Sequence, residues 1–174
     1  MTKQTPVLAI DPGLEKSGFV VWDGASVLAS GIEDNDWILR RIRNSNSPLV
    51  CEMIASYGMA VGKSVFETCV WIWRFQEACL VAGSPWNILY RLDVKLHVCK
   101  SPKAKDGNIR QALLDRIGPV GTLKNQGPLF GVKSHIWAAL ALAVTFFDKH
   151  YMQPAHTHEK TKTPSQSNPP KARA

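Results

Sequence analysis

Two acidic residues, Asp11 and Glu52, each stand at the end of a short apolar run, and this repeated pattern is the part of the sequence best suited to chemistry. Residues 7–10 and 49–51 have the length and composition of buried β-strands. A carboxylate at the end of a buried strand is costly to desolvate unless another group neutralises its charge. A divalent cation in a polar cleft would do this. The structural alternative is that Asp11 caps the turn that follows it.

The expected strands bring these two carboxylates together. Residues 6–11, 19–22 and 26–30 are predicted strands joined by short connections, which makes them an antiparallel meander. If the strand that ends at Glu52 lies beside the strand that ends at Asp11, both side chains meet at the same end of the sheet.

The later part of the chain is predicted to be mostly helical, with one more strand over residues 86–93. Helices are expected up to about residue 43, with Asp34 or Asp36 as the cap, and over residues 61–82, 106–117 and 135–149, with Ser134 capping the last. The helix at 61–82 carries more apolar surface than one buried face requires. It is therefore either buried between the sheet and other helices or part of a homodimer interface.

Positive charge is concentrated late in the chain. The formal net charge is +7 and the sequence pI is about 9.4. Residues 1–36 contain two lysines and six acidic residues, whereas residues 95–133 contain eight basic and two acidic ones. An acidic N-terminal part and a basic later part suit a metal-dependent enzyme acting on phosphates better than a simple basic DNA-binding module.

The 174 residues are predicted to form one domain over residues 1–150 and a disordered basic tail over residues 151–174. The four cysteines match no zinc-site spacing, so we expect free thiols. No signal peptide and no apolar stretch of membrane-spanning length is evident. We therefore expect a protein without membrane contact, in the cytoplasm of a bacterial or phage-infected bacterial cell.

Four short motifs follow one another along the chain. They are Ile10-Asp11-Pro12-Gly13 with Ser17-Gly18, then Val50-Cys51-Glu52, then the basic segment 95–105, then Gly131-Val132-Lys133-Ser134-His135-Ile136-Trp137-Ala138. In order and spacing they resemble the RuvC-type Holliday-junction resolvases, in particular a phage-like branch, over residues 6–148. The resemblance implies an α/β, RNase H-like fold (retroviral-integrase superfamily). Its mixed five-stranded sheet has an antiparallel meander of strands 1–3, then parallel strands, and is flanked by helices.

The resemblance also implies a metal-dependent nuclease. Phosphodiester hydrolysis requires an activated water and a stabilised leaving oxygen, and two divalent ions about 4 Å apart can supply both. Oxygen ligands suit Mg²⁺ or Mn²⁺. By resemblance, Asp11 bridges two such ions, Glu52 holds one, and His135 either ligates a metal or helps to activate the attacking water.

DNA contacts are implied in the same way. Phosphate contacts are expected from Lys95, Lys100, Lys103, Lys105 and Arg110, and one of the lysines is a candidate for stabilising transition-state charge. Resolvases of this family insert an aromatic wedge at the junction centre, but the matching position here is Ala55. Tyr57 or Met59 could serve instead; the alternative is that Tyr57 only packs on its loop.

One position departs from the family pattern. Many RuvC-like enzymes carry a further Asp on the last helix, three residues after the position of His135, where this chain has Ala138. Three explanations stay open. The site works with three protein ligands and more water, another acid such as Asp93 moves in, or a natural Asp was replaced to give an inactive form.

We therefore expect a homodimer, formed through the helix at 61–82, that cuts four-way (Holliday) or other branched DNA by paired, metal-dependent hydrolysis. One alternative is a catalytically impaired protein on the same fold that binds branched DNA. The other is a different RNase H-like nuclease, acting on flaps or RNA–DNA hybrids.

Overall fold

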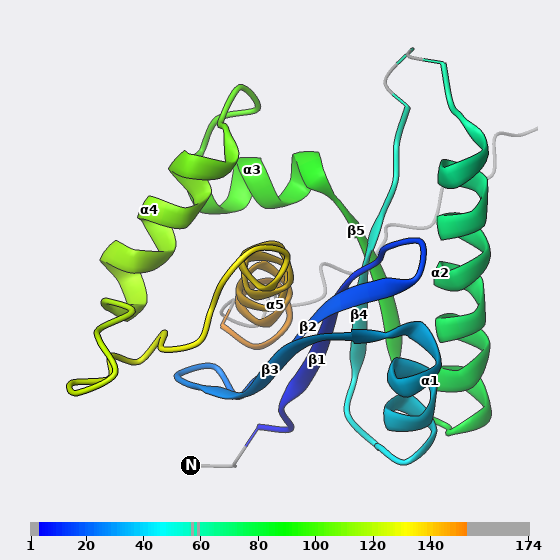
Figure 1. Cartoon of the computed structure of the whole chain (residues 1–174), viewed down its shortest axis with the longest axis horizontal. Helices are drawn as coiled ribbons and strands as arrows, with labels where there is room; N and C mark the ends of the chain where they lie inside the picture. Colours follow the sequence, from blue (N-terminus) through cyan, green and yellow to red (C-terminus); the bar gives the residue numbers. More distant parts are fainter. Residues whose placement is uncertain (1–3, 57, 59, 153–174) are drawn as a thin grey trace, which may run out of the picture.

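A five-stranded mixed sheet forms the centre of the molecule (Figure 1). The computed structural model describes residues 4–56, 58 and 60–152. Within them the strand order is β3-β2-β1-β4-β5, with β1–β3 antiparallel and β4 and β5 parallel to β1. The strands are β1 (Val7–Asp11), β2 (Lys16–Trp22), β3 (Val27–Asp34), β4 (Leu49–Met53) and β5 (Trp86–Tyr90). This is the RNase H-like sheet that the sequence predicts.

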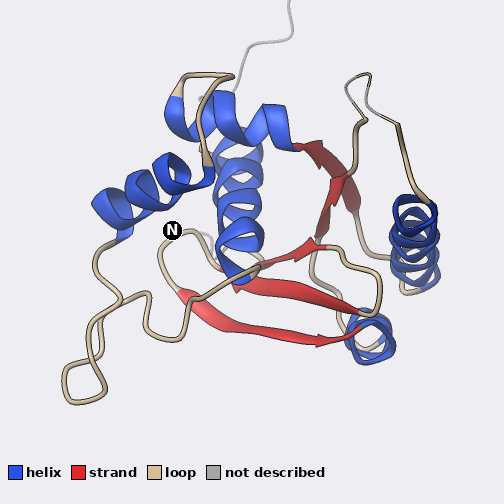
Figure 2. Cartoon of the chain, turned by 45° about the horizontal axis from the view of Figure 1, so that its top comes forward, coloured by secondary structure: helices blue, strands red, loops and turns tan. Residues whose placement is uncertain are grey.

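Helices cover both faces of this sheet (Figures 1 and 2). One face packs against α1 and α2, and the other packs against α5, with α3 and α4 outside α5. The described helices are α1 (Asn35–Arg43), α2 (Lys63–Val81), α3 (Arg91–Cys99), α4 (Asp106–Ile117) and α5 (Ile136–Tyr151). None of these described helices has both the length and the apolar character needed to cross a membrane. The four cysteines are free thiols, as expected.

The central strands are buried on both faces because their side chains alternate between two apolar layers. In β1, Val7 and Ala9 belong to the layer beneath α5, and Leu8 and Ile10 to the layer beneath α1 and α2. All four are at most 2% exposed. This double burial explains why β1 reads as a continuous apolar run up to Asp11.

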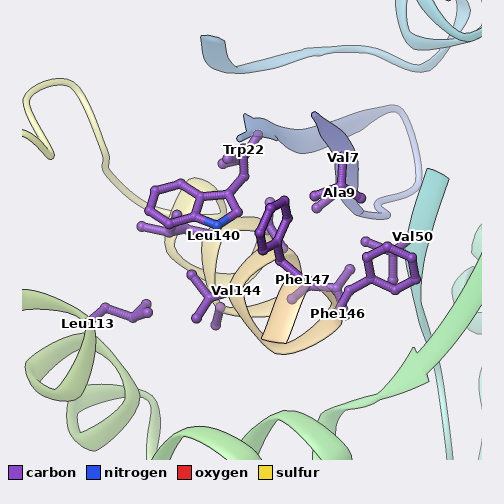
Figure 3. Packing of buried hydrophobic residues seen from close by; sticks show 14 of the residues in the cluster. Val7, Ala9, Trp22, Val50, Leu113, Leu140, Val144, Phe146 and Phe147 are labelled. Atoms are coloured by element: carbon purple, nitrogen blue, oxygen red, sulfur yellow. The ribbon is translucent and has the colours of Figure 1, made fainter. Parts of the chain in front are cut away.

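The helix α5 is the main element packed on the sheet, and ten of its residues are buried. Figure 3 shows Leu140 and Phe147 of α5 lying close to Trp22 of β2, while Leu113 of α4 approaches from the far side. Each large apolar side chain buried in this way contributes roughly 1.5–3 kcal/mol. The packing therefore fixes the position of α5, including the end at which His135 stands.

The structure corrects the sequence prediction after β5. The predicted strand at 86–93 ends at Tyr90, and Arg91–Cys99 form α3, a helix that the sequence analysis missed. The helix begins there because the carboxylate of Asp93 accepts a hydrogen bond from the backbone N–H of Tyr90, at 2.9 Å. Lys95 consequently lies on a helix rather than in an irregular basic stretch.

The start of the last helix is also corrected. Ser134 was predicted as its cap, but α5 begins at Ile136 with His135 in the cap position. Ser134 has a φ of 45°, a left-handed conformation that reverses the chain just before the helix. The strand predicted at 26–30 is longer, as β3 pairs with β2 from Lys16 to Trp22. Residues 153–174, most of the predicted tail, lie outside the described residues.

Candidate active site

Asp11 and Glu52 lie next to each other at the carboxyl ends of β1 and β4, as the sequence predicts. The two strands are parallel neighbours, with Ile10 level with Cys51, so the following residue of each strand stands at the same edge. The side chains of Asp11 and Glu52 are only 16% and 14% exposed. Both line a cavity of about 540 Å³. This edge of the sheet therefore combines two largely buried carboxylates with an open space beside them.

His135 joins this cavity from the start of α5. Its Nδ1 lies 2.9 Å from Oδ2 of Asp11, and its side chain is 69% exposed. The approach depends on Gly18, which pairs with Asp11 across β1 and β2. A Cβ atom on Gly18 would lie 2.9 Å from the Cβ and carbonyl carbon of His135, closer than real contacts allow. The glycine thus permits the helix start to reach the carboxylate.

A buried hydrogen-bond network holds the turn after Asp11. The hydroxyl of Ser17 donates to Oδ1 of Asn35 at 2.6 Å, and Nδ2 of Asn35 donates to the carbonyl of Gly13 at 3.0 Å. Ser17 and Asn35 are at most 1% exposed. The turn is therefore held by these two side chains. Within the described part of the chain, Asp11 makes its side-chain hydrogen bond to His135 instead, which argues against the turn-cap alternative.

Arg91 is a member of the cavity that the sequence analysis did not find. Its Nη2 lies 2.5 Å from Oδ1 of Asp106, and its Nη1 lies 3.6 Å from Oε2 of Glu52. It could have been found from topology, because β5 is parallel to β4 and its carboxyl end meets the same edge. The predicted strand ends at residue 93 rather than at Tyr90, so Arg91 is not predicted to stand at the strand end. Asp106, the first residue of α4, was likewise not singled out as a site residue.

Burial raises the pKa of both carboxyl groups at the end of the sheet. For Asp11 the rise is opposed by the hydrogen bond and positive charge of His135. For Glu52, burial raises the pKa to about 7, although Arg91 lowers it and Asp11 raises it further. A positive charge placed between the two groups would stabilise their ionised forms. A cation bound in this cavity would therefore lower both pKa values.

The donor set fits Mg²⁺ or Mn²⁺. Asp11 and Glu52 supply carboxylate oxygens and His135 an imidazole nitrogen, all lining one cavity. In the described ranges no three Asp, Glu, His or Cys side chains converge closely enough to enclose a metal ion by themselves. Mg²⁺ commonly keeps several waters and is held by one or two carboxylates together with substrate phosphates. The pair Asp11 and Glu52 matches that requirement.

The predicted DNA-contacting residues divide into three groups. Arg110 lines the cavity, with its guanidinium carbon 5.0 Å from the ring centre of Trp137. Lys95 is half-buried on α3, near enough for its charge to lower the pKa of Glu52. The exposed connection between α3 and α4 carries Lys100, Lys103 and Lys105. Tyr57, the predicted wedge, and Met59 lie outside the described residues.

Ala138 lines the cavity beside His135, so the position where the family often has an acid does face the site. Asp93, which was considered as a replacement acid, instead caps α3 through the backbone of Tyr90 and is not among the residues lining this cavity. Asp106 does line it. The acid that accompanies Asp11 and Glu52 in this cavity therefore comes from α4.

Two solved structures are similar to the chain over most of its length. One is a Thermus thermophilus RuvC structure, at 18% identity and a TM-score of 0.62, covering 83% of this chain and 95% of that one. The other is T. thermophilus RuvC in complex with Holliday junction substrate, at 16% identity and a TM-score of 0.61, covering 82% and 92%. The chain has the RuvC fold.

At these identities the similarity establishes the fold rather than the activity. No protein-family model matches the sequence, and no curated protein matches it. The RuvC fold accounts for the shared edge of β1 and β4, where Asp11 and Glu52 stand.

Proposed function

We propose that the chain is a metal-dependent endodeoxyribonuclease that resolves four-way or other branched DNA junctions, such as those formed in recombination and repair. The observation that carries this proposal is the convergence of Asp11, Glu52 and His135 on one cavity at the carboxyl edge of the sheet. A site of this composition on the fold of RuvC resolvases suits phosphodiester hydrolysis. The motifs favour a phage-like branch of that group, and the DNA substrate favours action in the bacterial cytoplasm.

Each residue of the site has a defined task in this proposal. Asp11 and Glu52 would hold one or two Mg²⁺ or Mn²⁺ ions. When bound, the ions would activate water and stabilise the leaving oxygen. His135 engages Asp11 through Nδ1, so Nε2 is the atom available to ligate a metal or to take a proton from the attacking water. General-base assistance of this kind typically contributes 10²–10⁴-fold.

The basic residues supply the DNA-binding surface. Lys95 and Arg110 lie close to the cavity, and Lys100, Lys103 and Lys105 extend the positive charge along the connection from α3 to α4. In Figure 1 this connection and the segment after β4 both project toward the end of the sheet that carries the site. A DNA backbone contacted by both would pass over Asp11 and Glu52. Tyr57, in the segment after β4, stays our prediction for the wedge.

The helix α2 offers the surface for a homodimer. One side of α2 packs into the core, where Ile72 and Phe75 are fully buried. The opposite stripe consists of Phe66, Val70, Trp73 and Leu80, which are 53–61% exposed. Large apolar side chains that lie together on an exposed helix face favour a protein interface. A symmetric dimer formed there would carry two sites and nick a junction on paired strands.

A second candidate function is favoured by Ala138 and by the open ligand set. With two carboxylates and no acid at position 138, the chain could bind branched DNA with little or no cleavage. A third candidate, a nuclease acting on flaps or RNA–DNA hybrids, shares the same fold and site chemistry. The three candidate functions differ in whether the chain cleaves DNA and in which substrate it cleaves.

The test is a cleavage comparison of three substrates. The purified chain is incubated with a four-way junction, a flapped duplex and an RNA–DNA hybrid, in Mg²⁺ or Mn²⁺. We expect the junction to be cut preferentially and Asp11→Asn to abolish cutting. Preference for the flap or the hybrid would support the third candidate. Tight junction binding with no cleavage by either the chain or its Ala138→Asp variant would refute the enzyme and support the binding protein.

A further inference from the structure

Arg91 and Asp106 are charged residues of the cavity to which the proposed function assigns no role. We propose that Arg91 is a catalytic residue that binds the scissile phosphate, and that Asp106 is the positioning residue that orients it. This inference rests on the proposed nuclease function, because it identifies how the same site holds its phosphate.

The position of Arg91 follows from the topology of the sheet. It is the first residue of α3, directly after β5, whose parallel pairing with β4 extends to Tyr90 opposite Met53. Arg91 therefore stands at the edge that carries Glu52. It lines the cavity that contains His135 and also a smaller one, of about 220 Å³, on the side of Met53 and Ile54. Asp11 and Glu52 line both cavities too.

The two ends of the guanidinium are used differently. Nη2 donates to Oδ1 of Asp106 at 2.5 Å. Nη1 is buried and has no hydrogen-bond partner in the described structure, since Oε2 of Glu52 is 3.6 Å away. A buried donor without an acceptor is unfavourable, and native sites usually supply the acceptor. A non-bridging oxygen of a phosphate in the cavity would provide one, and a guanidinium suits phosphate in shape and charge.

Two simpler roles for this pair fit the contacts less well. If Arg91 served only to neutralise Glu52, its shortest contact would go to Glu52, whereas that contact goes to Asp106. If Asp106 were itself a metal ligand, its carboxylate would be free to face the metal, but Oδ1 is engaged by Arg91 and the side chain is 81% exposed. The geometry matches an oriented arginine better than either.

The chemical role follows from where charge develops. In hydrolysis the water oxygen bonds to phosphorus while the bond from phosphorus to the leaving oxygen breaks. The water loses a proton, and the leaving oxygen gains one. Negative charge builds up on the non-bridging oxygens in between, and a fixed guanidinium stabilises it. Arg91 stays protonated throughout and forms no covalent bond. Arg110 stacks on Trp137 and is exposed, so it is less suited to this task.

The experiment measures junction cleavage and metal binding on the full chain, with the variants Arg91→Gln, Arg91→Lys, Arg91→Ala and Asp106→Asn. Arg43→Gln, an exposed arginine of α1 away from the cavity, is the matched control. At saturating Mn²⁺ we expect kcat to fall on the order of 100-fold in Arg91→Gln, as when one donor to a developing oxyanion is removed. Arg91→Lys keeps the charge and should lose less. Added guanidinium ion should partly restore Arg91→Ala and leave the wild type unchanged.

Metal affinity, measured by calorimetry without DNA, distinguishes phosphate binding by Arg91 from metal binding by Asp106. We expect Mn²⁺ to bind Arg91→Gln as tightly as the wild type or more tightly, because a competing cation is removed. Asp106→Asn should bind Mn²⁺ unchanged and lose roughly tenfold in kcat, with KM for the junction little altered. Melting curves check that each variant is folded. If Arg91→Gln unfolds, Arg91→Lys, which keeps the positive charge, takes its place in the comparison.

The outcomes that overturn the inference are distinct from failure of the proposed function. Wild-type turnover by Arg91→Gln, together with tighter Mn²⁺ binding, would make Arg91 a counter-ion of Glu52 only. Weaker Mn²⁺ binding by Asp106→Asn would make Asp106 a metal ligand and remove its positioning role. If the wild-type chain itself cleaves no substrate, the proposed function fails and the inference falls with it.

Discussion

Nδ1 of His135 lies 2.9 Å from Oδ2 of Asp11, although 124 residues separate the two in the chain. The contact joins the end of the central strand β1 to the start of the core helix α5. Because α5 is buried along most of its length, the backbone of its cap residue, His135, is held in place against the sheet. The geometry of the site is therefore a consequence of core packing, and several substitutions outside the cavity should disturb it.

Gly18→Ala should displace His135 without replacing any ionisable group. The new Cβ would lie 2.9 Å from the Cβ of His135, so strand or helix must shift. Overpacking of this kind costs about 1–3 kcal/mol, and a shift of the helix start should lower kcat on the order of 100-fold. Denaturant unfolding and junction cleavage measure the two effects. Gly62→Ala is the control, since no atom lies within 4 Å of its added Cβ; equal behaviour of the two variants would contradict the prediction.

Asn35→Ala should loosen the turn that follows Asp11. The substitution leaves the hydroxyl of Ser17 and the carbonyl of Gly13 without their buried partner, at a cost of about 1–3 kcal/mol. Asn44→Ala, which removes an exposed bond to the carbonyl of Arg40, should cost less than about 1 kcal/mol. Urea unfolding compares them. If Asn35→Ala is no more destabilising than Asn44→Ala, the network does not hold the turn.

Asp148→Asn should destabilise the packing of α3 and α4 on α5. Asp148 accepts two hydrogen bonds from Arg116, at 2.5 and 2.7 Å, and lies 2.7 Å from Nε2 of His97. Burial tends to raise the pKa of Asp148, but the bonds from Arg116 and His97 outweigh it, and the pKa is lowered from 3.8. We expect a loss of about 1–2 kcal/mol near pH 6, reduced from buried values because Arg116 is 42% exposed.

The sign of the pH dependence follows from that lowered pKa. A carboxyl group with a depressed folded-state pKa stabilises the protein above its unfolded pKa, and the contribution is lost as the pH falls through the folded value. The stability difference between wild type and Asp148→Asn should therefore be present at pH 5 and shrink as the pH falls below about 4. Unfolding curves between pH 2.5 and 7, on the order of ten pH values, measure it. A difference that grows toward low pH would contradict the prediction.

The double variant Phe66→Lys/Val70→Lys should convert a dimer to a monomer. The two side chains are 61% and 58% exposed on α2, so charging them should leave the fold intact while opposing association. Sedimentation measures the state of assembly, and Leu123→Lys, at an exposed position of the connection between α4 and α5, is the control. A wild-type chain that is monomeric at the same concentration would refute the dimer proposal.

The arrangement of the strands was predictable from two apolar runs that end in Asp11 and Glu52. The apolar residues indicate buried strands, and the acids mark the carboxyl ends of those strands. The meander, the parallel pairing of β4 and the end of α4 at Gly118 follow from local signals of this kind. Arg91 was not predictable from periodicity alone. The segment Arg91-Leu92-Asp93 continues the pattern of β5, and the hydrogen bond from the backbone N–H of Tyr90 to Asp93 that caps the helix is not visible in that pattern.

Contacts between side chains of distant segments could not be predicted from the sequence. The pairing of Ser17 with Asn35 and of Arg91 with Asp106 joins residues 18 and 15 positions apart across different elements. Neither pair belongs to a spacing that favours contact within one helix or strand. Of the three explanations for Ala138, the one in which Asp93 moves in is disfavoured by a local contact, because its carboxylate accepts a hydrogen bond from the backbone N–H of Tyr90.

The central claim is paired cleavage of a junction, and a supercoiled plasmid that extrudes a cruciform tests it most directly. The wild-type chain is incubated with this plasmid in Mn²⁺, beside Asp11→Asn. If the account is correct, both strands are cut within one bound complex and the first product is linear DNA with ends mapping to the cruciform, whereas Asp11→Asn gives none. Nicked circles as the only product would contradict paired incision, and an intact plasmid would contradict the nuclease itself.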